Sequence, residues 1–463
     1  MFKLTLPRRV ALALLILSAS PLAPVAPGWT GLAALADDDA PGGGGLGPAG
    51  PSGPDGPGGG GGMNMWGQGR RVSNCFFFSC PRQQRSRRMA REQVRKPAAP
   101  LEFVLFDVGP EARGALERAR FAVLADGPLT TAAGRILRVR APEGMGARTA
   151  LRRLTAAAPS ATVARNDIYR SFLRPAARAQ GRAARSVTLT ASVGCAAGAT
   201  VAMVDTDVDP RHPALAGAAI SRMAMRAPDR RPSTSRHGTA VASMLVGRED
   251  GPAPGLAPGL RLVVVDAFHA DASGQDATDA FDLARALDLL ANQEASVINL
   301  SLTGPDNAVL ARVVAQLVGN GRALVAAAGN DGPKAKPLYP AAYSGVIAVT
   351  AVDVAGVPWR RAARGAHVAF AAMGVDLALA GRKGEAESYS GTSFAAPAVS
   401  AMIAAKGIAP GDGPAAAQPA SALYEGLTAL AEDKGERGRD PVYGHGVLQP
   451  GDACRFANKP AQK

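Results

Sequence analysis

Three polar residues of the 463-residue chain stand at the boundaries of expected secondary-structure elements, where their side chains could do chemistry together. Asp205 ends the apolar run of residues 200–204, and His237 opens an apolar, helix-like segment further along the chain. Ser393 opens another helix-like segment near the C-terminus. Side chains at the ends of different elements can converge, so these residues are candidates for one reaction centre.

The residue types favour nucleophilic catalysis. A serine hydroxyl is too weakly acidic to attack an amide unless a base takes its proton. His237 can serve as that base because an imidazole titrates near neutral pH. A buried carboxylate, here Asp205, holds the required imidazole tautomer and stabilises the imidazolium. The three residues therefore predict attack by Ser393 with general-base help from His237.

The elements that must position these side chains alternate along the chain from residue 199 onward. Apolar runs predict strands at residues 200–204, 260–265, 296–302, 323–328 and 346–352, with helices between them at 277–290 and 307–318. Apolar strands alternating with helices indicate an α/β fold, a parallel sheet covered by helices on both faces. In such sheets the site lies at the carboxyl ends of the strands.

Several segments closely resemble the motifs of the subtilase family, the subtilisin-like serine peptidases. The order Asp, His, Ser along the chain is that of subtilisin, and it differs from the order in chymotrypsin and in the α/β-hydrolases. The most specific motif is Gly-Thr-Ser-Phe-Ala-Ala-Pro at residues 391–397. The resemblance covers about residues 195–454, and its other motifs are residues 201–206, 237–242, 301–304, 327–330 and 443–446.

The resemblance implies a role for each matching residue. Asp205 orients the imidazole, His237 is general base and then general acid, and Ser393 is the nucleophile. Asn330 matches the asparagine whose side-chain amide donates to the oxyanion, and the backbone N–H of Ser393 is the natural second donor. Four residues resemble the edge strand that pairs with extended polypeptide substrates, namely Ser301, Leu302, Thr303 and Gly304.

Two positions depart from the family pattern. The family usually has Gly after Asp-Thr, where this chain has Asp207, a carboxylate that could perturb the charge near Asp205 or bind a cation. The family's Gly-Gly on the substrate strand is replaced by Thr303-Gly304, which could alter how the substrate lies. No cofactor is required and no metal site is predicted. Calcium binding stays open, because several acidic loops could hold the ion although none has an EF-hand pattern.

Residues 101–170 predict a small α+β unit ahead of the large sheet. Strands are expected at 101–108, 135–139 and 162–169, and helices at 110–124 and 145–157. This unit resembles the subtilase propeptide, which folds beside the catalytic domain and inhibits it. Residues 171–190 are expected to be a cleavable linker and residues 191–463 the peptidase domain, with the mature chain beginning between about Phe172 and Thr190.

The N-terminal hundred residues predict export followed by a spacer. Basic residues precede a short apolar run at 10–17, and small-residue cleavage sites follow, so residues 1–36 are expected to be a secretory signal. A retained membrane anchor is the alternative, although the apolar core is short for a bilayer. Residues 37–100 are Gly/Pro-rich and then Arg-rich, and we expect them to be disordered. An anionic-envelope-binding patch is the alternative for the Arg-rich part.

Composition excludes several classes of protein. Hydrophobic residues make up 47% and charged residues 19%, which excludes global disorder. A multi-span membrane protein is excluded because only one apolar run approaches spanning length. Most of the formal net charge of +14 lies in residues 70–96 and 170–185. The folded parts are therefore nearly neutral, and nucleic acid is not an expected partner.

The four cysteines are too few for a disulfide scaffold. Export would allow Cys195 and Cys454 to pair and tie the two ends of the large domain together. Cys75 and Cys80 are close enough in sequence to close a small loop, and four cysteines permit three connectivities.

The sequence thus predicts a secreted serine endopeptidase, periplasmic or extracellular, that is made as a zymogen. It would hydrolyse peptide bonds through an Asp-His-Ser triad and an acyl-enzyme. Its expected partners are polypeptide substrates and its own propeptide-like domain, without an integral membrane domain. The alternative is a catalytically silent relative that serves as a surface or envelope binding protein.

Overall fold

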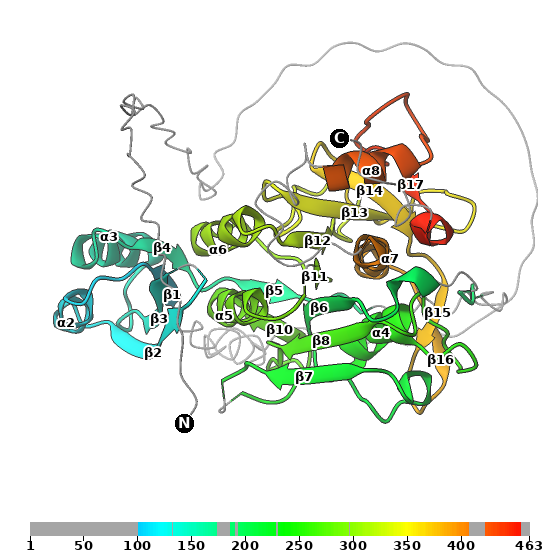
Figure 1. Cartoon of the computed structure of the whole chain (residues 1–463). Helices are drawn as coiled ribbons and strands as arrows, with labels where there is room; N and C mark the ends of the chain where they lie inside the picture. The colour runs from blue at the N-terminus through cyan, green and yellow to red at the C-terminus, as the bar shows by residue number, and fades with distance from the viewer. Residues whose placement is uncertain are drawn as a thin grey trace, which may run out of the picture. The chain divides into compact units, whose positions relative to one another are not determined.

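The computed structural model describes two ordered parts of the chain, a small α+β unit and a large α/β domain (Figure 1). The predicted signal, the spacer, Cys75, Cys80 and most of the predicted linker lie outside the described residues. The described ranges are 101–131, 133–173, 186–189, 193–227, 230–295, 297–406 and 422–454.

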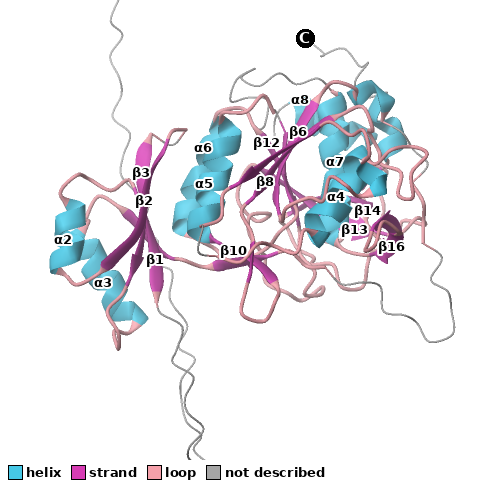
Figure 2. Cartoon of the chain, turned by 90° about the horizontal axis from the view of Figure 1, so that it is seen from below, coloured by secondary structure: helices cyan, strands magenta, loops and turns pink. Residues whose placement is uncertain are grey.

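The small unit is a four-stranded antiparallel sheet in the order β2-β3-β1-β4. Its strands are β1 (Glu102–Phe106), β2 (Ala122–Leu129), β3 (Gly134–Arg140) and β4 (Thr162–Arg165). Two helices, α2 (Ala112–Arg118) and α3 (Ala147–Ala157), cover one face (Figure 2). The small α+β unit expected from the sequence is therefore present.

Alternation along β1 gives this sheet two buried faces. Phe103 and Leu105 pack against α2 and α3, whereas Val104 and Phe106 join a cluster with helices α5 (Ala280–Ala291) and α6 (Ala308–Gly319) of the large domain. Successive side chains of a strand point to opposite faces, so both sets are buried at once. Burial against the large domain adds to the core of a unit that is small for independent stability.

The prediction of a helix over residues 110–124 is wrong after residue 118. α2 ends at Arg118, and Arg120 adopts the left-handed conformation with φ 66°. The following residues enter β2 instead. Such a turn usually carries glycine, and an arginine at this position gives no signal that a helix ends.

The strand expected at residues 162–169 is divided in two. β4 stays in the small sheet, and β5 (Ile168–Arg170) pairs antiparallel with β10 (Asp276–Asp279) of the large domain. β10 also pairs with β9 (His269–Ala270). The C-terminal end of the small unit therefore runs along the large domain.

The large domain is built on an eight-stranded sheet in the order β17-β14-β13-β12-β11-β6-β8-β7. All of its neighbouring strands are parallel. In chain order the strands are β6 (Thr200–Asp205), β7 (Ile220–Ala224), β8 (Arg261–Asp266), β11 (Val297–Leu300), β12 (Ala323–Ala327), β13 (Val346–Val352), β14 (Val368–Met373) and β17 (Val447–Leu448).

Helices cover both faces of this sheet, which confirms the predicted α/β class. α5 and α6 pack on one face, while α4 (Arg236–Val246) and α7 (Thr392–Ala405) pack on the other (Figure 2). A hairpin of β15 (Leu377–Ala380) and β16 (Ala386–Tyr389) precedes α7, and α8 (Ala422–Leu430) follows it. None of the helices in the described part of the chain has the length and hydrophobicity that crossing a membrane requires.

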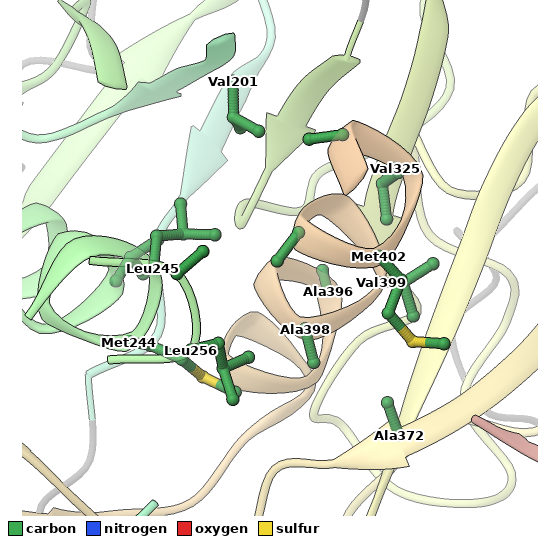
Figure 3. Packing of buried hydrophobic residues seen from close by; sticks show 14 of the residues in the cluster. Val201, Met244, Leu245, Leu256, Val325, Ala372, Ala396, Ala398, Val399 and Met402 are labelled. Atoms are coloured by element: carbon green, nitrogen blue, oxygen red, sulfur yellow. The ribbon is translucent and has the colours of Figure 1, made fainter. Parts of the chain in front are cut away.

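α7 is hydrophobic on all sides, as is typical of a helix that is buried in the core of a domain. Every residue from Thr392 to Ala405 is buried. Figure 3 shows Val399 and Met402 on this helix, close to Val325 and Ala372 of the sheet. α4 contributes Met244 and Leu245 to the same cluster.

Cys195 and Cys454 form a disulfide, which confirms the expected pairing. Their Cα atoms are 5.5 Å apart although 259 positions separate them in the sequence. The bond thus joins the first and last described parts of the large domain. A covalent link across so long a loop restricts the unfolded chain strongly.

A buried charge cluster lies where the small unit meets α5. Asp279 accepts from the backbone N–H of Asp282 at 2.9 Å and caps α5. Asp279 also contacts Arg230 at 2.6 Å and, across the junction, Arg138 of β3 at 3.5 Å. Burial, with the charge of Asp279 as a smaller cause, raises the pKa of the Asp282 carboxyl. Asp282 is therefore a carboxyl that the folded state prefers to keep protonated.

We expect Asp282→Asn to make the chain's stability less dependent on pH. A raised pKa in the folded state stabilises the fold below the unfolded value and loses that contribution as pH rises through the folded value. A tenfold difference in proton affinity corresponds to about 1.4 kcal/mol, so the variant should gain on the wild type by at least about 1 kcal/mol between pH 4 and 8. Urea unfolding at several pH values measures this. The exposed Glu249→Gln is the control, and parallel pH profiles of Asp282→Asn and wild type would contradict the prediction.

Candidate active site

The carboxyl end of β6 meets the N-terminus of α4. Asp205 is the last residue of β6 and His237 the second residue of α4, and both side chains are buried. Asp205 Oδ1 lies 2.7 Å from His237 Nδ1 and also accepts from the backbone N–H of Thr206 at 2.7 Å. Nδ1 then carries a proton toward the carboxylate, which leaves Nε2 as the basic nitrogen.

A glycine permits this close approach. A Cβ on Gly238 would lie 2.3 Å from the carbonyl oxygen of Thr206, so any larger residue would push α4 away from β6. The backbone N–H of Gly238 donates to Thr206 Oγ1 at 2.8 Å. Thr206 and Gly238, which follow Asp205 and His237 in the sequence, thus hold β6 and α4 together.

Ser393 is the second residue of α7 and is 2% exposed. Its hydroxyl donates to the carbonyl of Ser301 at 3.4 Å, and His237 Nε2 has no hydrogen-bond partner among the residues that the structure describes. The His237 ring lies 5.8 Å from the ring of Phe394, the residue after Ser393. The structure therefore places the serine and the histidine in one region without a hydrogen bond between them, and such bonds are often long or unformed without substrate.

A chain of buried hydrogen bonds fixes the start of α7 against β11. Ser301 Oγ donates to the carbonyl of Ser393 at 2.7 Å, and the Asn299 amide donates to Ser301 Oγ at 2.9 Å. Ser400 Oγ in turn donates to Asn299 Oδ1 at 3.1 Å. Asn299 and Ser400 were not among the residues predicted from the sequence. A polar residue inside an apolar strand and another inside an apolar helix were the signals that could have identified them.

Asn330 lies three residues after the end of β12, and hydrogen bonds hold its side-chain oxygen. Its Oδ1 accepts from the backbone N–H of Thr392 at 3.0 Å and from Thr392 Oγ1 at 2.9 Å. The same hydroxyl accepts from the backbone N–H of Gly329 at 3.1 Å. With Oδ1 occupied, the amide nitrogen is left to face Gly391, where an added Cβ would lie 3.5 Å from it. Thr392 is a further residue whose role was not predicted from the sequence.

The predicted substrate strand carries the tail of the small unit. Thr303 and Arg170 exchange two backbone hydrogen bonds, 2.9 and 3.0 Å long, in an antiparallel bridge. On the other side, Gly304 pairs with Tyr339. Ser301 and Leu302 are buried beside these residues. An extended polypeptide therefore already lies along this edge.

A tyrosine of that tail fills the space above Gly304. The Tyr169 side chain is fully buried, and a Cβ on Gly304 would lie within 2.4 Å of its ring. The Tyr169 hydroxyl donates to the carbonyl of Pro305 at 2.7 Å. Gly304 is the residue of the Thr303-Gly304 pair that is still a glycine, and its lack of a Cβ makes room for the Tyr169 ring.

Asp207 turns out to have a partner of its own. Its carboxylate oxygens lie 3.0 and 3.1 Å from Arg222 Nη1, so its charge is balanced locally. Within the described ranges no group of three or more His, Cys, Asp or Glu side chains is arranged to hold a metal ion.

Known proteins resemble this chain over the large domain. A family profile described as the Subtilase family matches residues 196–446. Thermitase from Thermoactinomyces vulgaris is 34% identical over 218 residues, which cover 45% of this chain and 76% of thermitase. Minor extracellular protease Epr from Bacillus subtilis is 33% identical over 46% of this chain, but the match spans only 32% of Epr.

One solved structure has the same fold over a longer stretch. Fervidolysin from Fervidobacterium pennivorans, described as a keratinolytic enzyme related to subtilisin, aligns with a TM-score of 0.60. The alignment covers 79% of this chain and 62% of fervidolysin at 20% sequence identity. This likeness concerns the fold.

Removing the Asn330 side chain, or the Thr392 hydroxyl that orients it, should lower turnover without weakening substrate binding. We expect Asn330→Ala to lower kcat by about 10²-fold or more, a magnitude measured for this family, and Thr392→Val by roughly tenfold, since one of two anchors of Oδ1 remains. KM should stay nearly constant for both, because the interaction forms only in the transition state. Steady-state peptide hydrolysis measures both constants. Thr350→Val, which also removes a buried hydroxyl, is the control. A rise in KM alone would contradict the orienting role.

Proposed function

The chain belongs to the subtilase family, the subtilisin-like serine endopeptidases, and from this membership and the site geometry we propose that it is an exported endopeptidase made as a zymogen. The observation that carries the proposal is the 2.7 Å contact between Asp205 and His237, with Nε2 free and the N-terminus of α7 beside the ring.

In the proposed reaction Ser393 Oγ attacks the scissile carbonyl carbon while His237 Nε2 takes its proton. Asp205 Oδ1 accepts from Nδ1–H and stabilises the imidazolium. The oxyanion receives hydrogen bonds from the Asn330 amide and from the backbone N–H of Ser393. His237 returns the proton to the leaving amine, and an activated water then hydrolyses the acyl-enzyme. The serine must first rotate away from the carbonyl of Ser301.

Ser393→Ala and His237→Ala should each abolish peptide hydrolysis to a similar extent, and the double variant should be scarcely slower than either. The two side chains act in one step, so their losses are not additive. Hydrolysis of a fluorogenic peptide measures the rates. Near wild-type hydrolysis by Ser393→Ala would show that the triad is wrong. A fluorophosphonate probe that leaves wild-type Ser393 unlabelled would favour the alternative, a silent relative that binds surfaces.

We also propose that the small unit is an inhibitory prosegment. Its tail occupies the strand at residues 301–304 as an extended substrate would, with Tyr169 buried above Gly304. Continuing the antiparallel register from Arg170 and Thr303 brings Phe172 opposite Ser301. The carbonyl of Ser301 is the group that Ser393 Oγ contacts. The bond after Phe172 is therefore the one nearest the nucleophile.

Two features of the chain support export, namely a disulfide and a signal-like segment. The Cys195–Cys454 disulfide fits an oxidising compartment outside the cytosol. The chain also opens with the basic and apolar residues of a secretory signal, within residues 1–36. We propose that the protein acts in the periplasm or outside the cell, on polypeptides.

N-terminal sequencing of the mature protein should give Leu173, because the register places the bond after Phe172 at the nucleophile. Ser393→Ala purified alone should remain uncut if the chain processes itself. The fragment of residues 101–172, added in trans, should inhibit the mature enzyme, and Tyr169→Ala should weaken that inhibition by at least about 30-fold, as for a buried interface tyrosine.

The exposed Arg153→Ala is the matched control in the same fragment, and it should inhibit like the wild type. Fully active secreted enzyme that still carried residues 101–170 covalently, and that the fragment did not inhibit, would contradict the prosegment role. Normal cutting of Ser393→Ala would instead assign the cleavage to another protease.

A further inference from the structure

A cavity of about 900 Å³ lies beside the N-terminus of α4. Its lining comes from residues 207–213, from residues 234–239 and from the β15–β16 turn at residues 381–384, together with Arg222. Arg236 lines the cavity and directly precedes His237. The cavity therefore adjoins the proposed acid–base pair, and the mechanism above does not use it.

The cavity lining has a surplus of positive charge. Two carboxylates in the lining, Asp207 and Asp209, are each paired with one arginine, Arg222 and Arg211 respectively. The cationic side chains that line the cavity are Arg211, Arg222, Arg236, Arg382 and Lys383. Two of these arginines are paired within the lining, and three cations remain.

The remaining three cations have one carboxylate between them. Glu387 lies 3.1 Å from Arg382 and 3.6 Å from Arg236. Lys383 forms no ion pair with any residue of the described ranges. The Nε and Nη2 atoms of Arg236 are buried and form no hydrogen bond with any residue in the described part of the chain. The cavity lining therefore holds more cationic groups than the carboxylates around it can balance.

None of the residues that line the cavity belongs to the strands along which the tail of the small unit lies. The tail of the small unit approaches through β5, which pairs with β10. From Arg170, which lies opposite Thr303, the tail runs toward Ser301, whose carbonyl accepts from Ser393 Oγ. Residues before the scissile bond therefore lie along β10 and residues 301–304, which leaves the cavity beside His237 for residues that follow the bond.

We propose that this cavity binds acidic side chains of the substrate that follow the scissile bond. The inference rests on the proposed peptidase function and names a substrate class for the same site. Arginine guanidinium groups match carboxylates with paired hydrogen bonds. The occupant is a polypeptide segment because the cavity adjoins His237, and a peptidase substrate must pass this histidine.

The test uses two peptides that differ only after the scissile bond. Both carry Tyr-Arg-Ser-Phe before the bond, the sequence of residues 169–172, and either Glu-Glu or Gln-Gln two positions after it. We expect the purified active enzyme to cleave the Glu peptide with a kcat/KM about tenfold higher at low salt, roughly the effect of two partly exposed ion pairs. At about 0.5 M salt the preference should fall to near unity.

Variants of the hairpin turn connect the preference to the cavity. Arg382→Gln combined with Lys383→Gln should remove most of the discrimination while the Gln peptide is cleaved as before. Arg437→Gln, an exposed arginine outside the cavity, is the control and should keep the discrimination. Equal kcat/KM values for the two peptides, or a preference that survives in the turn variant, would overturn the inference.

A binding measurement separates this inference from the peptidase proposal. If neither peptide is cleaved, the proposed function fails. Fluorescence anisotropy of the two labelled peptides with Ser393→Ala protein still decides about the cavity. Tighter binding of the Glu peptide that is lost in the turn variant supports the cavity as an acidic-peptide site. Equal binding of both peptides overturns the inference, and it does so even if a polyanionic resin retains the protein.

Discussion

The burial of α7 constrains everything else in the large domain. A fourteen-residue helix without an exposed face can sit only where sheet and α4 surround it, so its first turn has a fixed place at the carboxyl edge of the strands. Ser393 lies in that turn, and hydrogen bonds from Ser301 and to Asn330 hold the turn from two strands. The position of the Ser393 hydroxyl is thus a consequence of core packing.

The same edge organises the contact with the small unit. One face of the small sheet is covered by its own helices and the other by α5 and α6, so the unit is completed by the domain it rests on. The tail that leaves β4 is led onto the strand beside Ser393. Folding of the small unit and occupation of the strand at residues 301–304 are therefore physically linked.

Charge is distributed unequally around the site. The triad region contains one buried carboxylate and one imidazole, and Asp207 beside it is balanced by Arg222. Beyond Arg236 the cavity holds more cations than carboxylates. Most of the net positive charge of the sequence lies outside the large domain, so this local surplus depends on which side chains the hairpin turn brings to α4.

The sequence by itself determined the class of fold, singled out Asp205, His237, Ser393 and Asn330 as candidate site residues, and offered the Cys195–Cys454 pairing as one option, because motifs and apolar runs are local patterns. It could not predict β2, since Arg120 ends the helix without a glycine. The orientation of Asn330 by Thr392 and the cavity beside α4 were decided only by the tertiary structure. Each depends on contacts between segments far apart in the chain, which no local pattern encodes.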